Sequence, residues 1–175
     1  MDTTKAIREL DRMLGKQGLT YVLYTCGGAQ LIFLGYNTRR TEDVDLIIEE
    51  IDEELRLASL EVAKKLDLEE DWLNNKVFAL GKRLGRGWKK KAVTLFEGKA
   101  ITLMGLDRQS LINAKLHAAI DRKGEDYDDL IFLKPSLAEV KLAEVYVLKQ
   151  KQGLETAAVF VRAWLKELTD ELGLN

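Results

Sequence analysis

Two carboxylates and two glycines near the start of the chain are residues of the kind that bind a metal–nucleotide complex. Asp43 and Asp45 stand two residues apart in an apolar run, and the pair Gly27–Gly28 precedes them. Side chains two apart on a strand share a face, so the carboxylates repel each other unless a cation lies between them. Oxygen ligands suit Mg²⁺ or Mn²⁺ rather than zinc. Glycines let a phosphate approach the backbone, and the N–H groups at a helix start favour an anion. The segment therefore predicts a pocket for a nucleoside triphosphate.

A strand, a short helix and a second strand must position these groups. Tyr21–Tyr24 is an apolar run of strand length, and Ala29–Leu34 has the spacing of a short helix that ends near Gly35. A polar turn, Asn37–Glu42, leads to a second strand, Asp43–Ile48. The side chains of this strand that we expect in the core are Val44, Leu46 and Ile48. A plain turn followed by two solvated aspartates is the alternative interpretation.

In this order and spacing, the segments resemble the nucleotidyltransferase superfamily. The glycine pair, the short helix, the run Arg40-Thr-Glu-Asp-Val-Asp45 and the apolar strand are similar to its small prokaryotic branch, related to the abortive-infection and toxin–antitoxin nucleotidyltransferases. The resemblance implies an α/β fold, with a small mixed β-sheet flanked by helices. It also implies metal-dependent transfer of a nucleoside monophosphate from a nucleoside triphosphate to a hydroxyl of RNA or protein. It assigns Asp43 and Asp45 to one or two Mg²⁺ or Mn²⁺ ions, and Gly27, Gly28, Arg39 and Arg40 to the nucleotide.

A second group of charged residues lies in the later, helical part of the chain. Lys115 is followed by Arg122 and then by Asp126 and Asp129. This order also resembles the small nucleotidyltransferases, in which a helix lysine and a following aspartate complete the pocket. Carried over, Lys115 is a catalytic and nucleotide-binding residue that neutralises charge on the leaving pyrophosphate. Asp126 or Asp129 orients Lys115 or Arg122, which adds Asp129 to the nucleotide site. A lysine with a buried stem, paired with Asp129, is the structural alternative.

A third metal-binding carboxylate is commonly present on a neighbouring strand in nucleotidyltransferases. Ala92–Glu97 and Ala100–Met104 alternate in polarity and are joined by Gly98-Lys99, which predicts a β-hairpin. Glu97 is the nearest candidate for this ligand, and its place beside the turn is also compatible with simple exposure. The resembling family also carries a segment like Asp71-Trp-Leu-Asn74, in which we expect Trp72 in the core, with stacking on a base as the alternative.

The segment Gly81–Lys91 concentrates positive charge. It holds six basic residues, three glycines and no acidic residue. One interpretation is a solvated, mobile loop. The other is a local patch for nucleotide phosphates or an RNA backbone, with Trp88 as a stacking platform.

The whole chain limits the class of protein. Its 175 residues, 46% of them hydrophobic, suffice for a core, and its net charge of −2 excludes a strongly basic nucleic-acid binder on bulk charge. One cysteine and one histidine exclude an internal disulfide and make a structural zinc site a poor fit. The polar N-terminus and the absence of a long apolar run predict a cytoplasmic protein without a membrane span.

We expect a nucleotidyltransferase-like α/β core over residues 1–105, with an α-helical region over residues 106–175 packed on it. Helices are predicted up to about Lys16, with Asp2 or Thr3 as the cap, and over Ile51–Leu68, with Asp52 as the cap. Two amphipathic helices, Ser136–Gln152 and Glu155–Leu172, either pack on the first half or form a homodimer face. Ser136 and Glu139 predict a capping box at the start of the first of these two helices.

Three other functions remain open from the sequence. The first is a catalytically inactive binding module with a nucleotidyltransferase fold, favoured by the doubtful third carboxylate. The second is the toxin component of a toxin–antitoxin system, held in check by an antitoxin-like protein. A metal-dependent phosphohydrolase is the weakest of the three.

Overall fold

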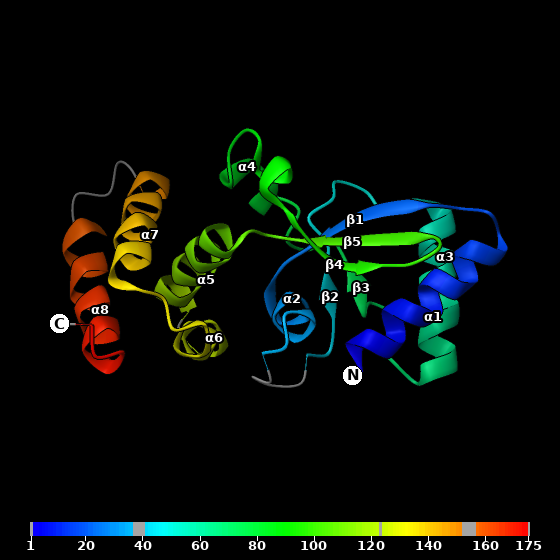
Figure 1. Ribbon diagram of the computed structural model, residues 1–175, viewed down its shortest axis with the longest axis horizontal. Helices are drawn as coiled ribbons and strands as arrows, with labels where there is room; N and C mark the ends of the chain where they lie inside the picture. The colour runs from blue at the N-terminus through cyan, green and yellow to red at the C-terminus, as the bar shows by residue number, and fades with distance from the viewer. Residues whose placement is uncertain (1, 37–40, 123, 152–156, 175) are drawn as a thin grey trace. The chain divides into compact units, whose positions relative to one another are not determined.

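Strands and helices alternate in the first part of the chain, and helices alone follow in the second (Figure 1). The computed structural model describes residues 2–36, 41–122, 124–151 and 157–174. It divides into two compact units, Met1–Asp107 and Arg108–Asn175. The sequence predicts a boundary after residue 105, two residues before this division. The predicted packing of the helical region on the core stays a prediction.

The first unit is a mixed α/β structure, as the sequence predicts. The nucleotidyltransferase fold in particular stays a prediction. Its elements are α1 (Thr3–Lys16), β1 (Tyr21–Thr25), α2 (Gly27–Phe33), β2 (Val44–Asp45), α3 (Glu53–Leu66), β3 (Leu73–Asn74), α4 (Leu80–Arg83), the 3₁₀ turn η1 (Trp88–Lys91), β4 (Val93–Glu97) and β5 (Ile101–Gly105). Both predicted helix caps are confirmed. The Asp2 carboxylate accepts the Lys5 N–H (2.9 Å), and the Asp52 carboxylate accepts the Leu55 N–H (2.9 Å).

A three-stranded sheet with the order β1-β5-β4 forms the centre of the first unit. β1 and β5 are parallel, and β4 and β5 form the antiparallel hairpin that the sequence predicts. β2 and β3 form a separate parallel pair, and a bridge between Thr25 and Leu46 joins β2 to the end of β1. The predicted strand Asp43–Ile48 is therefore too long. Ile47 is also more buried than Ile48, because the Ile47 side chain packs against α4.

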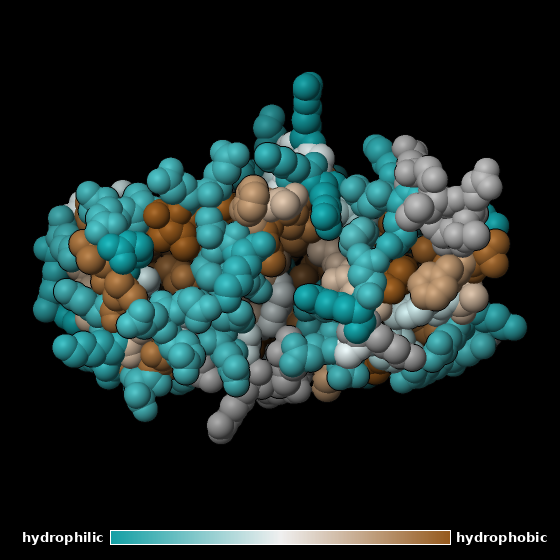
Figure 2. Space-filling view, turned by 180° about the vertical axis from the view of Figure 1, so that it is seen from behind, coloured by the Kyte–Doolittle hydropathy of each residue, from teal (hydrophilic) through white to brown (hydrophobic). Residues whose placement is uncertain are grey.

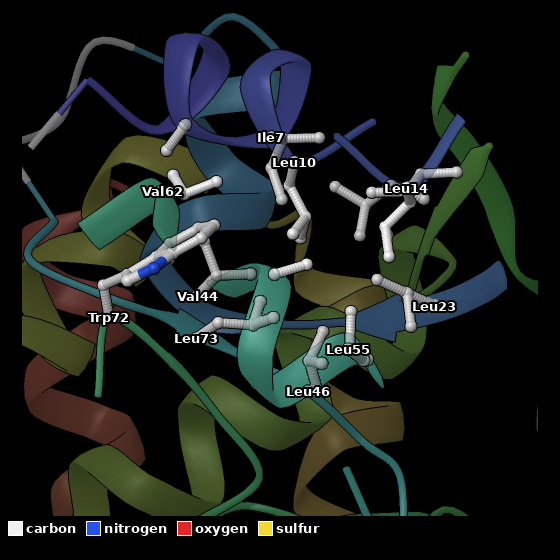
Figure 3. Packing of buried hydrophobic residues seen from close by; sticks show 14 of the residues in the cluster. Ile7, Leu10, Leu14, Leu23, Val44, Leu46, Leu55, Val62, Trp72 and Leu73 are labelled. Atoms are coloured by element: carbon white, nitrogen blue, oxygen red, sulfur yellow. The ribbon is translucent and has the colours of Figure 1, made fainter. Parts of the chain in front are cut away.

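The hydrophobic core of this unit lies between α1, α3 and the strands (Figure 3). Ile7, Leu10 and Leu14 of α1 are fully buried, as their helical spacing predicts. Trp72 is also fully buried and donates from Nε1 to the Ser59 carbonyl (2.9 Å), which confirms the core assignment and excludes stacking on a base. The other residues labelled in Figure 3 are Leu23, Val44, Leu46, Leu55, Val62 and Leu73.

A carboxylate of α1 holds the turn of the β4–β5 hairpin. Asp11 accepts the backbone N–H groups of Ala100 (2.8 Å), Ile101 (2.8 Å) and Lys99 (3.3 Å). It lies so close to Gly98 that a Cβ there would stand 2.1 Å from an Asp11 oxygen. The turn therefore needs glycine at this position for space.

The described residues of the second unit form four helices. They are α5 (Arg108–Arg122), α6 (Glu125–Leu133), α7 (Leu137–Gln150) and α8 (Ala157–Glu171). Ser136 and Glu139 form the predicted capping box at the start of α7. Tyr127 of α6 lies edge-on to Trp164 of α8 at 5.3 Å and donates a hydrogen bond to Glu171. Several hydrophobic residues of α7 and α8 are exposed, and brown patches mark this part of the surface in Figure 2: Leu142, Val145, Val159 and Phe160. No described helix is both long and apolar enough to cross a bilayer.

Candidate functional site

The backbone around Asp45 fixes this residue beside the end of β1. The Cys26 N–H donates to the Asp45 carbonyl (3.4 Å), and Thr25 Oγ1 donates to the same oxygen (2.9 Å). One residue pair further along, the Ile47 N–H donates to the Tyr24 carbonyl (2.7 Å). These bonds hold Asp45 directly against the start of α2.

The two predicted carboxylates stand on the side of β2 that faces away from the core. Val44 and Leu46 are fully buried, whereas Asp43 and Asp45 are half-buried. This alternation is the one that the sequence predicts for a strand. The buried Thr41 donates from Oγ1 to the Asp43 carboxylate (3.3 Å), which restricts the orientation of that side chain.

Gly27 meets Asp45 in space. Gly27 has a φ of +71°, and a Cβ built on it would stand 3.7 Å from Asp45 Oδ2. Gly27 and Gly28 are the first two residues of α2, which confirms that the glycine pair starts a helix, and the predicted apolar stretch from Ala29 forms the rest of α2. Cys26, at the N-cap, makes no capping bond with its side chain and is buried, as expected for a small core residue. The two halves of the sequence motif are therefore adjacent.

Two polar residues of the β3 region join this arrangement, and the sequence did not reveal their role. Asn74 pairs with Asp45 in the β2–β3 register. Lys76 forms an ion pair with Asp71 (2.6 Å). The hydrogen bond that Lys76 donates to Asp71 and the charge of Asp71 raise the pKa of Lys76, with smaller contributions from the charges of Asp43 and Asp45. The backbone N–H of Lys76 donates to the side chain of Asn74 (3.0 Å), the register partner of Asp45. In the sequence, the segment Asp71-Trp-Leu-Asn74 was the signal that pointed to this region.

Glu97 is at the other end of the sheet. It pairs with Thr102, which pairs with Val22, whereas the carboxylate pair lies beyond Thr25. Three residues of strand correspond to about 10 Å. The register therefore separates Glu97 from the carboxylate pair, and Glu97 is exposed, as its place beside the turn allows. Across the residues that the structure describes, no three acidic, histidine or cysteine side chains are grouped as metal ligands.

Lys115, in the second unit, is enclosed by carboxylates. Its ammonium lies 2.8 Å from Asp126 and 2.5 Å from Asp129, and its side chain is only 6% exposed. Arg122 binds the second oxygen of Asp126 (2.7 Å). Burial alone would lower the pKa of Lys115, but the charges of Asp126 and Asp129 outweigh burial and raise it. Both sequence interpretations are represented here: the aspartates orient the cations, and the lysine is a buried structural partner.

Arg39 and Arg40, predicted to assist nucleotide binding, lie outside the described residues. The structure thus brings together Gly27, Gly28, Asp43 and Asp45 in the first unit, and separately Lys115, Asp126 and Asp129 in the second.

Comparisons of this chain with protein-family models, with curated proteins and with solved structures found no match.

Proposed function

We propose that the first unit is a metal-dependent nucleotidyltransferase that moves a nucleoside monophosphate from a nucleoside triphosphate to an acceptor hydroxyl. The observation that carries this proposal is the position of Gly27 beside the Asp45 carboxylate, whose Oδ2 would stand 3.7 Å from a Cβ on Gly27. It puts a backbone that a phosphate can approach next to a pair of carboxylates. A triphosphate bound through a divalent cation needs both features in one place.

The carboxylate pair fits a Mg²⁺ or Mn²⁺ ion. Mg²⁺ is commonly held by one or two carboxylates, with water and substrate phosphates completing its ligands. Asp43 and Asp45 supply two carboxylates from one face of β2, half-buried but accessible. A bound divalent ion would neutralise phosphate charge and lower the pKa of the acceptor hydroxyl.

The residues around the pair have supporting roles in this proposal. Thr41 orients Asp43 through its hydroxyl, and the hydrogen bonds of Thr25 and Cys26 to the Asp45 carbonyl hold that residue in place. Gly27 leaves room for the phosphates. Lys76, two residues after the register partner of Asp45, offers a positive charge to the leaving pyrophosphate from within the same unit.

Transfer of label from nucleotide to acceptor tests this function. The purified chain is incubated with each nucleoside triphosphate labelled at the α-phosphate, with Mg²⁺ or Mn²⁺, and with total RNA or protein. We expect incorporation that falls at least about 100-fold in Asp45→Asn, the scale on which loss of an electrostatic contact to the reacting group acts. Glu42→Gln is the matched control, because Glu42 is an exposed acid next to the pair. Full incorporation by Asp45→Asn would disprove the mechanism.

One observation favours a second candidate, an inactive module that binds nucleotide without transferring it. Within the described residues the carboxylate pair has no third acidic partner grouped with it. Binding of a Mg²⁺–nucleotide complex that depends on Asp45, with no label reaching any acceptor, would establish this alternative. An antitoxin-like protein partner stays a prediction.

A further inference from the structure

The basic segment Gly81–Lys91 is a continuous surface of positive charge in the first unit. No acidic residue occurs from Lys76 to Phe96. The sequence led us to expect a loop, but the segment contains a helical turn, α4, and the 3₁₀ turn η1. Its basic residues are all exposed: Lys82, Arg83, Arg86, Lys89, Lys90 and Lys91. Hydrophilic side chains cover the top of the view in Figure 2, where α4 and η1 lie.

Aromatic contacts fasten this segment to β1. The Trp88 ring lies edge-on to Tyr24, with ring centres 5.2 Å apart. The Lys89 ammonium lies 4.8 Å from the centre of the Tyr24 ring. A Cβ on Gly81 would stand 3.2 Å from the Ile47 side chain and 3.7 Å from the Trp88 ring. Trp88 is therefore an anchor that is half-buried, and not the free stacking platform that the sequence suggested.

The anchor lies next to Asp45 along the paired backbones. The Ile47 N–H donates to the Tyr24 carbonyl (2.7 Å), and the Cys26 N–H donates to the Asp45 carbonyl (3.4 Å), so Tyr24 and Ile47 lie two residues from the pair Cys26 and Asp45. Two residues of strand correspond to about 7 Å. The residues that contact the basic segment, Tyr24 and Ile47, are therefore about two strand residues away from the Asp45 end of the carboxylate pair.

Much of this positive charge is available to a ligand. Lys82 stands 4.0 Å from Glu49, but both side chains are mostly exposed, so the pair is weak. Among the residues that the structure describes, Arg86, Lys90 and Lys91 have no acidic partner. The Phe78 ring, 43% exposed and 5.9 Å from the Lys82 ammonium, can stack on a base.

We infer that the basic segment binds the phosphodiester backbone of a single-stranded RNA, whose end supplies the acceptor hydroxyl. This inference rests on the proposed function and names its acceptor class. Basic side chains beside an exposed aromatic ring are typical of surfaces for single-stranded nucleic acid. An acidic protein would match the charge, but its carboxylates offer no flat ring to stack on Phe78. Each nucleotide of a single-stranded RNA offers both a phosphate and a base that can stack.

Binding of a fluorescent 12-nucleotide RNA of mixed sequence to the full chain tests this inference. Fluorescence anisotropy is measured from about 50 to 200 mM salt, the range in which phosphate contacts change affinity strongly. The test variant combines Arg86→Gln, Lys90→Gln and Lys91→Gln. The control combines Arg8→Gln, Lys5→Gln and Lys16→Gln, which removes the same charge from exposed positions of α1.

We expect the test variant to bind RNA at least about fivefold more weakly at low salt, with a salt slope smaller by about 2, since each single-strand phosphate contact contributes about 0.7. The control should bind like the wild type. Equal weakening in both variants, or in neither, would overturn the inference. Competition by polyglutamate as effective as that by RNA would overturn it in favour of an acidic protein.

Asp45→Asn separates this inference from the proposed function. This variant should lose label transfer and keep its RNA affinity. RNA binding that depends on Arg86, Lys90 and Lys91, in a wild type that transfers no label, would defeat the enzyme proposal and keep the RNA surface. If label transfer to RNA were unchanged in the test variant, the enzyme proposal would stand and the RNA surface would be defeated.

Discussion

The two groups of acidic residues in this protein differ in how deeply they are buried. In the second unit, Asp126 and Asp129 surround one buried lysine, and Arg122 adds a further positive charge. In the first unit, Asp43 and Asp45 stand half-buried on one face of β2. One group is enclosed in the fold together with its cations, whereas the other is within reach of solvent.

This difference separates a structural group from a candidate binding site. A buried ion pair that is complete has little reason to bind a further charge, and its loss is costly to the fold. Two accessible carboxylates on one face are stabilised by an external cation. Lys115 therefore holds α5 and α6 together, and we propose the carboxylate pair as the part of the protein that binds a ligand.

Breaking the buried group should have the largest effect. Lys115→Met removes the charge that compensates two buried carboxylates, so we expect the free energy of unfolding to fall by about 3–5 kcal/mol. Urea denaturation of the full chain measures it. Lys141→Met, at an exposed position of α7, is the control and should change stability by less than about 0.5 kcal/mol. Similar losses in the two variants would show that the buried cluster is not special.

Acid should weaken the same cluster. Burial alone would raise the pKa of Asp126, but the charges and hydrogen bonds of Lys115 and Arg122 outweigh burial and lower it. A carboxyl with a lowered pKa stabilises the fold above its ordinary value of 3.8, and this contribution is lost as the pH falls through the folded-state pKa. Unfolding measured from pH 6 to about pH 3 should show a steeper loss of stability in the wild type than in Asp126→Asn. Parallel curves would contradict the assignment.

A smaller effect is expected at the glycine pair. Gly27 has a φ of +71°, so Gly27→Ala forces a left-handed backbone on an alanine and should cost about 1 kcal/mol. Gly28 is not among the glycines with positive φ, and Gly28→Ala serves as the comparison. Thermal unfolding measures both variants, and an equal cost at the two positions would show that conformation is not the cause.

The smallest effect on stability is expected at the carboxylate pair itself. Asp45→Asn keeps the shape of the side chain and removes one of two like charges, so the stability of the free protein should change by less than about 1 kcal/mol. Addition of Mg²⁺ with a nucleoside triphosphate should raise the melting temperature of the wild type and leave that of Asp45→Asn unchanged. A variant stabilised like the wild type would remove the pair from the binding site.

Local patterns in the sequence predicted those parts of the fold that local interactions determine. Asp2, Asp52 and Ser136 cap their helices as expected, and Gly98-Lys99 turns the predicted hairpin. The positions of Asp43 and Asp45 opposite the buried Val44 and Leu46 followed from the two-residue period of a strand.

The remaining features depend on contacts between distant segments. β3 has only two residues, too few for a periodic pattern, yet it brings Asn74 beside Asp45. The enclosure of Lys115 depends on the packing of α6 against α5, and the separation of Glu97 from the pair depends on the strand register. Neither can be read from spacing along the chain.

The strand order has a consequence for how the protein is made. β5 is the central strand of the sheet, but it is the last strand of the first unit to be synthesised. Asp11 accepts hydrogen bonds from backbone groups as far along the chain as Ile101. β1 can pair with its parallel partner only after the same segment has been synthesised. Pairing across such separations closes a long loop and slows folding. A nascent chain that ends before residue 101 therefore exposes an unpaired strand and the apolar face of α1, and we expect chaperones to bind it there until β5 leaves the ribosome.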